Sequence, residues 1–418
     1  MKRIIQFFIL TITIVVASSC SQQNNLTRYN LAPNYTDQFP GRFMNQQIYH
    51  VNDTLSELSI RIVPSLIPNL KAKQVELYSY LSLTYSVYSS MNKKDIIQTN
   101  TYKLTDLLAF EDMEDGIIKM TIPLKLIQNQ NYLVLVSVQN LVDKQNFLKY
   151  HQVFKTKFAA ENYRILNEND EIVWVNWIRD NLKIKVQYRY QDSTSILLSY
   201  FKPKFGPALP PFSDLANKDL MVDEPFEQFQ LQLFNGKSSI IELPREGVYK
   251  FHSSVNDQDG KTILKLYENF PSVVSESQKV FGLRYLTPFK EFSMMLKDDP
   301  AHTIQEFWFF EDRTKERSQE LMKTYYARML RANRLFTTYK EGWKTDRGMI
   351  FMIYGPPDQV YYQLGKEIWE YGPDAYHNDL KFVFNKSSNI LSHNAMLLDR
   401  GLEYKHSWYT LLDNWRNE

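Results

Sequence analysis

Length, composition and charge already exclude several classes of protein. The chain has 418 residues, of which 44% are hydrophobic and 23% charged, which is typical of a folded globular chain of two or three domains. Wholesale disorder, collagen-like repeats and a polytopic membrane protein are therefore excluded. Lys and Arg number 49 against 47 for Asp and Glu, so the chain lacks the excess positive charge that nucleic-acid binding requires. We expect no nucleic acid among its partners.

The N-terminus has the pattern of a secretory signal peptide. Lys2 and Arg3 precede an apolar run over residues 4–16, which is shorter than the about 20 residues of a bilayer-spanning helix. Small residues then lead to Cys20, the single cysteine in the sequence. This arrangement resembles the lipobox of bacterial lipoproteins, in which the cysteine receives the lipid. An ordinary cleaved signal with an incidental cysteine is the alternative.

The resemblance to a lipobox implies a membrane anchor. We expect a signal peptide over residues 1–19, a lipid on Cys20, and a flexible tether over residues 20–40. Ser21 rather than an aspartate follows the cysteine, which favours the outer membrane. The body would face either the periplasm or the exterior.

Two successive regions, residues 41–160 and 161–278, have the pattern of antiparallel, immunoglobulin-like β-sandwich domains. Short apolar runs alternate with polar turn clusters in both regions, and aromatic residues, which favour sheets, are abundant. Four prolines within residues 202–211 predict a long loop in the second domain, or alternatively a linker. The expected strands include residues 58–62, 81–87, 118–122, 132–138, 172–178, 182–190, 229–234, 247–252 and 262–267.

The last region, residues 279–418, has helical periodicity followed by short strands. Apolar residues recur at intervals of four, four, three and four and predict one buried helix face: Leu321, Tyr325, Met329, Ala332 and Phe336. Arginines on the same helix are expected on a solvated face: Arg328, Arg331 and Arg334. Capping signals predict helix starts at Thr287-Pro288 and at Thr303 with Glu306. Strands over residues 349–354, 360–362, 367–371 and 381–384 complete an α+β domain with an antiparallel sheet.

A distinctive motif lies between the long helix and these strands. It reads Gly342-Trp343-Lys344-Thr345-Asp346-Arg347-Gly348, followed by Tyr354-Gly355-Pro356-Pro357-Asp358. Together these segments resemble the signature of the GWxTD domain, a module of bacterial lipoproteins and secreted proteins whose function is unknown. The resemblance extends to Leu283-Arg284-Tyr285, Phe307-Trp308, residues 332–336, Trp369 and Phe382. The sequence Glu311-Asp312-Arg313 departs from an expected Arg-Asp-Pro type of turn. The resemblance implies an architecture rather than an activity.

The parts of this signature have a structural interpretation. Gly342 and Gly348 suit a tight passage from helix to strand, because glycine adopts backbone angles that other residues avoid. Trp343 is expected to anchor the core. Thr345 and Asp346 are expected to accept hydrogen bonds from loop amides, with Arg347 or another cation as an ion-pair partner of the aspartate.

The second part of the signature, residues 354–358, is expected to be a rigid turn. The competing interpretation makes Asp346 and Asp358 an acid–base pair. Hydrolysis of a glycoside needs two carboxyl groups within about 10 Å. An extended strand between the two residues would hold them about 20 Å apart, which disfavours that pair.

We expect a non-catalytic envelope lipoprotein that binds a protein partner and serves in interaction or as a scaffold. One alternative is glycan binding, with Trp174 or Trp177 as a stacking surface. Another is an envelope hydrolase that uses carboxylates of the last domain, such as Asp346 with Glu367 or Glu370. We expect no cofactor and no metal, because the seven histidines lack the close spacing of zinc ligands.

Overall fold

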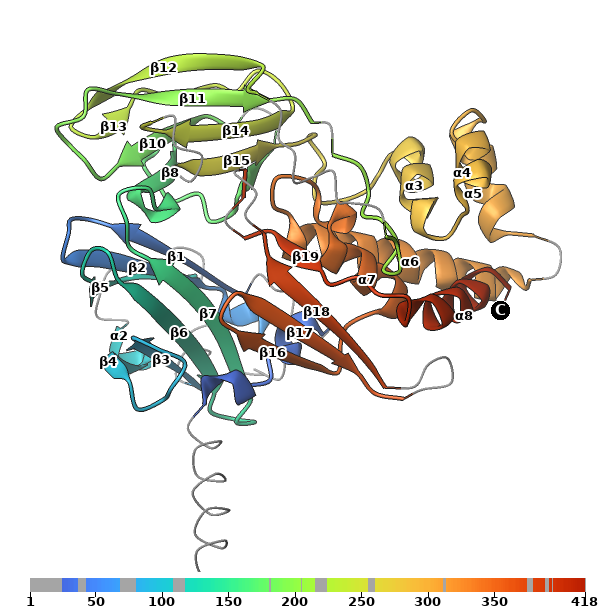
Figure 1. Ribbon diagram of the computed structural model, residues 1–418, viewed down its shortest axis with the longest axis horizontal. Helices are drawn as coiled ribbons and strands as arrows, with labels where there is room; N and C mark the ends of the chain where they lie inside the picture. The colour runs from blue at the N-terminus through green and yellow to red at the C-terminus, as the bar shows by residue number, and fades with distance from the viewer. Residues whose placement is uncertain are drawn as a thin grey trace, which may run out of the picture.

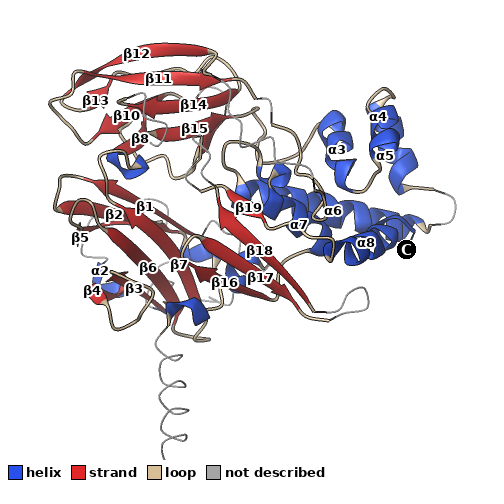
Figure 2. Ribbon diagram, in the orientation of Figure 1, coloured by secondary structure: helices blue, strands red, loops and turns tan. Residues whose placement is uncertain are grey.

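The computed structural model describes residues 25–36, 43–67, 80–107, 117–179, 182–203, 205–214, 224–254, 260–310, 313–373, 379–387, 391–392 and 394–417. The expected signal peptide and Cys20 lie outside them. Figure 1 shows two strand-rich units stacked on each other and a third, mainly helical unit beside them. The division into strands and helices is clear in Figure 2. In the described part of the chain, no helix is long and apolar enough to cross a bilayer.

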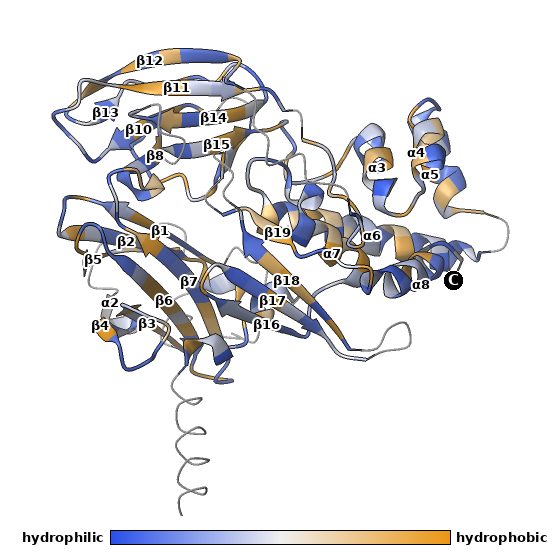
Figure 3. Ribbon diagram, in the orientation of Figure 1, coloured by the Kyte–Doolittle hydropathy of each residue, from blue (hydrophilic) through white to orange (hydrophobic). Residues whose placement is uncertain are grey.

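The first strand-rich unit consists of two antiparallel sheets around one core. Alternate apolar residues of both sheets, such as Ile60 and Val136, are fully buried in that core. Figure 3 shows the corresponding apolar stretches along the strands. One sheet has the order β1 (Met44–His50), β2 (Leu55–Ile62) and β5 (Ile118–Lys125). The other has the order β4 (Ile96–Lys103), β3 (Leu81–Tyr88), β6 (Asn131–Asn140) and β7 (Asn146–Phe154).

The second strand-rich unit is a single curved sheet, antiparallel except for the pairing of β15 with β9. Strands from both parts of the sheet, for example β8 and β14, contribute to one core, so the sheet folds back on itself. Its order in the described residues is β8 (Tyr163–Asn167), β10 (Ile184–Tyr188), β13 (Lys237–Ser238), β12 (Glu227–Phe234), β11 (Ser195–Phe201), β14 (Gly247–His252), β15 (Lys261–Lys265) and β9 (Trp177–Ile178).

The third unit packs helices against an antiparallel sheet. Its sheet has the order β16 (Gln359–Gln363), β17 (Lys366–Tyr371), β18 (Leu380–Lys386) and β19 (Met396–Leu398). The helices are α3 (Glu276–Gly282), α4 (Phe289–Met295), α5 (Pro300–Trp308), α6 (Lys315–Phe336), α7 (Asp346–Tyr354) and α8 (Tyr404–Asn417). The predicted apolar face of α6 is buried as expected.

Several local expectations are wrong. Residues 349–354 belong to helix α7, not to a strand. Of the predicted strand 172–178, only residues 177–178 form a strand, and Ile172 makes an isolated bridge to Leu166 of β8. Helix α5 begins after Asp299, whose carboxylate caps it, so Thr303 lies inside the helix. Pro288 is the N-cap of α4 instead of its first helical residue. The other expected strands are present, most of them with shifted ends.

Residues 25–36 differ from the expected flexible tether. They form two short 3-10 helices, η1 (Leu26–Arg28) and η2 (Ala32–Tyr35), wedged between the first and third units. Leu26 donates its N–H to Met91 on one side, and Leu31 donates its N–H to Val360 on the other. Leu26 is fully buried in the core of the third unit. This segment therefore belongs to the folded body.

We predict that Leu26→Ala lowers the free energy of unfolding by about 2–5 kcal/mol, because it opens a cavity in a shared core. The measurement is urea denaturation of the full chain, with Leu402→Ala as the control, since Leu402 is 74% exposed. A loss below about 0.5 kcal/mol would contradict docking of this segment and agree with a free tether.

Candidate functional site

The first part of the signature joins α6 to α7 through the 3-10 helix η8 (Gly342–Lys344). A side-chain carbon on Gly342 would lie 1.9 Å from the carbonyl oxygen of Ala332, and one on Gly348 would lie 1.9 Å from that of Gly342. Neither glycine has a positive φ angle. The expectation of unusual backbone angles is therefore wrong: these glycines are required because three backbone segments touch.

Trp343 lies in the core, as expected, and its backbone is held on both sides. Its N–H donates to Asn333 Oδ1 at 3.2 Å, and its carbonyl accepts from the hydroxyl of Tyr285 at 2.9 Å. Thr345 caps helix α7: its Oγ1 accepts from Gly348 N–H at 3.0 Å and donates to the Gly342 carbonyl at 2.7 Å. These polar groups of the loop thus have hydrogen-bond partners within the third unit.

Asp346 occupies the first turn of α7 and is 3% exposed. Its Oδ1 lies 2.6 Å from Nη2 of Arg400, and its Oδ2 accepts from the N–H of Leu398 at 2.8 Å. Arg400 also donates to the carbonyl of Leu209 in the proline-rich loop. Asp346 therefore binds the amide of Leu398, which belongs to strand β19 instead of a loop, and its cation partner is Arg400, not Arg347.

Arg347 instead pairs with Glu367 of β17 at 3.1 Å. The other carboxylate oxygen of Glu367 accepts from Tyr35 at 2.9 Å and from the indole of Trp369 at 2.6 Å. Burial, reinforced by the Glu367 charge, raises the pKa of Tyr35 well above its usual value, so its hydroxyl stays a donor. The signature arginine therefore connects to the docked N-terminal segment through Glu367.

The second part of the signature ends α7 and turns into β16. Gly355 has φ of 88° at the helix C-cap, which favours glycine. Arg328 of α6 donates to the carbonyls of Met352 and Ile353 at 3.0 Å and so satisfies the end of α7. Asp358 Oδ2 accepts from Gly372 N–H at 2.7 Å. The turn is tied to the sheet, in line with its structural interpretation.

The basic residues of α6 also have structural partners. Arg328 binds the end of α7, and Arg331 donates to the carbonyl of Tyr35 in the docked segment. Both are half-buried, so the expected solvated face applies to Arg334 alone. Helical periodicity could not reveal this, because their acceptors are backbone carbonyls distant in the sequence.

The acid–base hypothesis has little support in this geometry. A recess of about 10 Å³ touches Asp346 and Arg347, and that volume corresponds to about one water molecule. Glu370 pairs with Lys381 and lies three positions after Glu367, an odd number, which places it on the opposite face of β17. The separation of Asp346 from Asp358 was argued from a strand that is in fact helix α7. The acid–base pair is still disfavoured, because the carboxylate of Asp346 is bound by Arg400.

A larger concavity lies elsewhere in the third unit, between α4, α5 and the end of α8. It has a volume of about 740 Å³, within the range of ligand-binding clefts. Apolar residues from both walls line it: Met294, Met295, Phe307 and Phe310. Met294 is 62% exposed, and the neighbouring Phe289 is 72% exposed. We call this concavity the α4–α5 groove.

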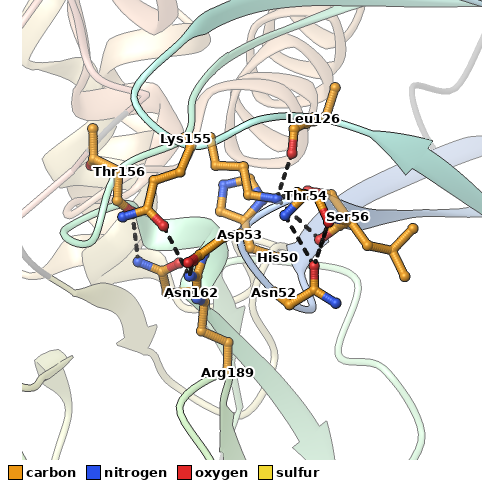
Figure 4. Close-up of polar contacts among 12 residues, drawn as sticks. His50, Asn52, Asp53, Thr54, Ser56, Leu126, Lys155, Thr156, Asn162 and Arg189 are labelled. Atoms are coloured by element: carbon orange, nitrogen blue, oxygen red, sulfur yellow. Dashed lines mark hydrogen bonds and ion pairs between the residues drawn. The ribbon is translucent and has the colours of Figure 1, made fainter.

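A buried polar cluster connects the two strand-rich units (Figure 4). Lys155 and Ser56 are fully buried, and Lys155 Nζ donates to Ser56 Oγ at 3.1 Å and to the carbonyls of Leu55 and Leu126. His50 Nδ1 lies 2.8 Å from the same hydroxyl. Burial lowers the pKa of Lys155 to about 8.

A serine, a lysine of lowered pKa and a histidine have the chemistry of a nucleophile with its base. In this structure all three side chains are shielded from solvent, so a substrate cannot reach Ser56. Lys155 joins the ends of β2, β5 and β7, which is a structural role. Within the described ranges, no three His, Cys, Asp or Glu side chains form a metal-binding group.

The comparisons with known proteins agree with the signature. The model of the GWxTD domain matches residues 247–417, so the chain is a GWxTD domain-containing protein. The match begins at strand β14, within the second strand-rich unit. No curated protein matches the chain.

Two solved structures show weak similarity. The crystal structure of red sea bream transglutaminase is 10% identical with a TM-score of 0.18, and the alignment covers 54% of this chain and 31% of that one. The C-terminal domain of the Streptococcus agalactiae AgI/II polypeptide BspA is 9% identical with a TM-score of 0.17, over 54% of this chain and 100% of that one. The chain thus spans about a third of the transglutaminase. Similarity at this level supports no inference about function.

We predict that Asp346→Ala lowers the free energy of unfolding of the full chain by about 3–5 kcal/mol, because it leaves Arg400 without its buried partner. Asp346→Asn should cost less, since an amide oxygen still accepts from Leu398. Adding Arg400→Met to Asp346→Ala should recover part of the loss. Urea denaturation measures all three variants, with Glu370→Ala at an exposed ion pair as the control, which should cost at most about 1 kcal/mol. Wild-type stability of Asp346→Ala would contradict this assignment.

We predict a pH-dependent stability from His50. Burial lowers the pKa of His50 from 6.5 to about 4. Attraction by Glu161 opposes this shift, and repulsion from Lys155, Arg189 and His151 adds to it. The folded chain then binds fewer protons than the unfolded chain between these two pH values, so stability falls as the pH falls from about 6.5 to about 4. The total loss is about 3 kcal/mol.

The test compares wild type with His50→Gln by urea denaturation between pH 4.5 and 7. Glutamine does not titrate, so the variant should lose stability less steeply with acidification, whatever its stability at pH 7. Equal slopes would show that His50 does not titrate in this way.

Proposed function

We propose that this GWxTD protein is a non-catalytic envelope lipoprotein, anchored through Cys20 at the outer membrane, that binds a protein partner through its third unit. In this proposal the strand-rich units are immunoglobulin-like domains that support that unit. The observation that carries the proposal is the α4–α5 groove. It exposes Met294 and lies beside the exposed Phe289, and apolar side chains that gather at a concave surface are typical of an interaction site.

The residues of the signature support a non-catalytic role, because they are bonded inside the protein whereas the groove is open. Trp343 and Asp346 are buried, and Thr345, Asp346 and Arg347 each bind other parts of the same unit. A catalytic carboxylate needs access to a substrate and a free position for a proton. Asp346 and Glu367 both lack these, because arginine, tyrosine, indole and amide donors occupy their oxygens.

The glycan-binding alternative has less support. Trp177 packs edge-on against Phe270 with ring centroids 4.9 Å apart, so part of the ring is used inside the protein. Stacking on a sugar needs an exposed ring face. The groove, by contrast, is open and apolar and suits a protein partner.

The test is site-specific crosslinking in the bacterium's own envelope. A photoreactive amino acid replaces Met294 in one variant and Leu402, an exposed residue outside the groove, in the control. We expect one discrete protein adduct at position 294 that is absent at position 402. No adduct at position 294, or the same adducts at both positions, would contradict binding of a partner at the groove.

A further inference from the structure

We infer that the α4–α5 groove binds an amphipathic helix of its partner, with basic side chains beside the apolar face of that helix. This inference rests on the proposed function, because it specifies the chemistry of the partner at the same groove. Three properties of the groove carry it: the apolar side chains, the helical walls and the charges at the rim.

The apolar side chains belong to regular helix faces. Met294 lies one turn after Lys290 on α4, and Met295 lies one turn after Glu291. On the facing wall, Thr303 and Phe307 lie one turn apart on α5, and Phe310 follows the end of that helix. Methionine adapts to the shape of an apolar ligand, and phenylalanine gives it a firm contact. Such a surface binds the i, i+3, i+4 and i+7 side chains of a helix.

The walls exclude a partner strand. A strand binds by adding to an exposed sheet edge, where free backbone groups accept it. The walls of this groove are α4, α5 and α8, so it offers no sheet edge to a strand (Figure 1). A helix satisfies its own backbone and needs only side-chain contacts. Two turns of a helix about 10 Å across occupy roughly 850 Å³, close to the groove volume of about 740 Å³.

The charges at the rim favour basic side chains on that helix. Glu291 and Arg416 form a two-bonded ion pair at 2.8 and 2.9 Å and neutralise each other. The remaining lining charges are Asp298, Glu306 and one cation, Lys290. Both carboxylates lie on exposed residues, and Glu306 also lies 3.5 Å from His302. Rim charges of this kind select partners of opposite sign and accelerate association.

The experiment measures binding of three labelled model peptides of 18 residues by fluorescence anisotropy. The first is an amphipathic helix of Leu and Lys, the second has Glu in place of Lys, and the third is the first with a central proline. The protein is residues 20–418 carrying Cys20→Ala, which needs no detergent because it has neither the apolar signal segment nor a lipid. We expect the Leu/Lys helix to bind at least tenfold more tightly than either of the other two peptides.

Three variants locate and characterise the site. Met294→Asp should weaken the Leu/Lys helix at least tenfold, whereas the matched control Leu402→Asp should leave it unchanged. The double variant Asp298→Lys with Glu306→Lys should reverse the preference toward the Leu/Glu helix. None of these residues is buried, so the variants should keep the wild-type melting temperature, which is measured on the same samples.

Each contrary outcome overturns the inference. Equal binding of the Lys and Glu peptides would show that the partner helix need not be basic. Equal binding of the proline peptide would show that the ligand need not be helical. Equal effects of Met294→Asp and Leu402→Asp would show that the peptide does not bind at the groove. If the crosslink at position 294 forms while the peptides fail to bind, the proposed function stands and only this choice of partner is wrong. If no crosslink forms, the proposed function fails as well.

Discussion

The ion pair between Asp346 and Arg400 is the contact on which the third unit depends. Asp346 opens helix α7, Leu398 ends strand β19, and Arg400 reaches Leu209 in the proline-rich loop of the second unit. One carboxylate thus joins a helix, a sheet edge and a neighbouring unit. A buried charge pair of this kind is costly to break because each partner would remain charged and poorly solvated. This explains an aspartate in the signature without any catalytic role.

The close backbone contacts around Gly342 and Gly348 act with that ion pair. The glycines allow α6, η8 and α7 to approach more closely than any side chain would permit. Thr345 then caps α7 at the position where Asp346 can turn toward β19. The residues of the signature therefore form one packing arrangement in which each fixes the position of the next. The α4–α5 groove, at which we propose that a partner binds, lies away from it.

Sequence periodicity predicted the regular parts of this fold and failed where tertiary contacts decide. The buried face of α6 follows from spacing alone, because a helix repeats every 3.6 residues. Residues 349–354 were wrongly predicted to form a strand, since Met-Ile-Phe-Met-Ile-Tyr is apolar on all sides and is compatible with either a strand or a buried helix. Arg400 lies 54 residues after Asp346, so no local sequence pattern could predict that these two residues pair. The α4–α5 groove arises from α8 meeting a distant helical pair, which no motif encodes.

The docked N-terminal segment constrains how the proposed anchor presents this groove. Asn25 already bridges to Asn92 of the first unit, and Tyr35 is bound by Arg331 and by Glu367. If Cys20 carries a lipid, five residue steps separate it from Asn25 and span at most about 18 Å. The body is then held within that distance of the membrane surface at this point. Because the same segment contacts the Arg347–Glu367 pair, residues 25–36 connect the proposed anchor to the signature.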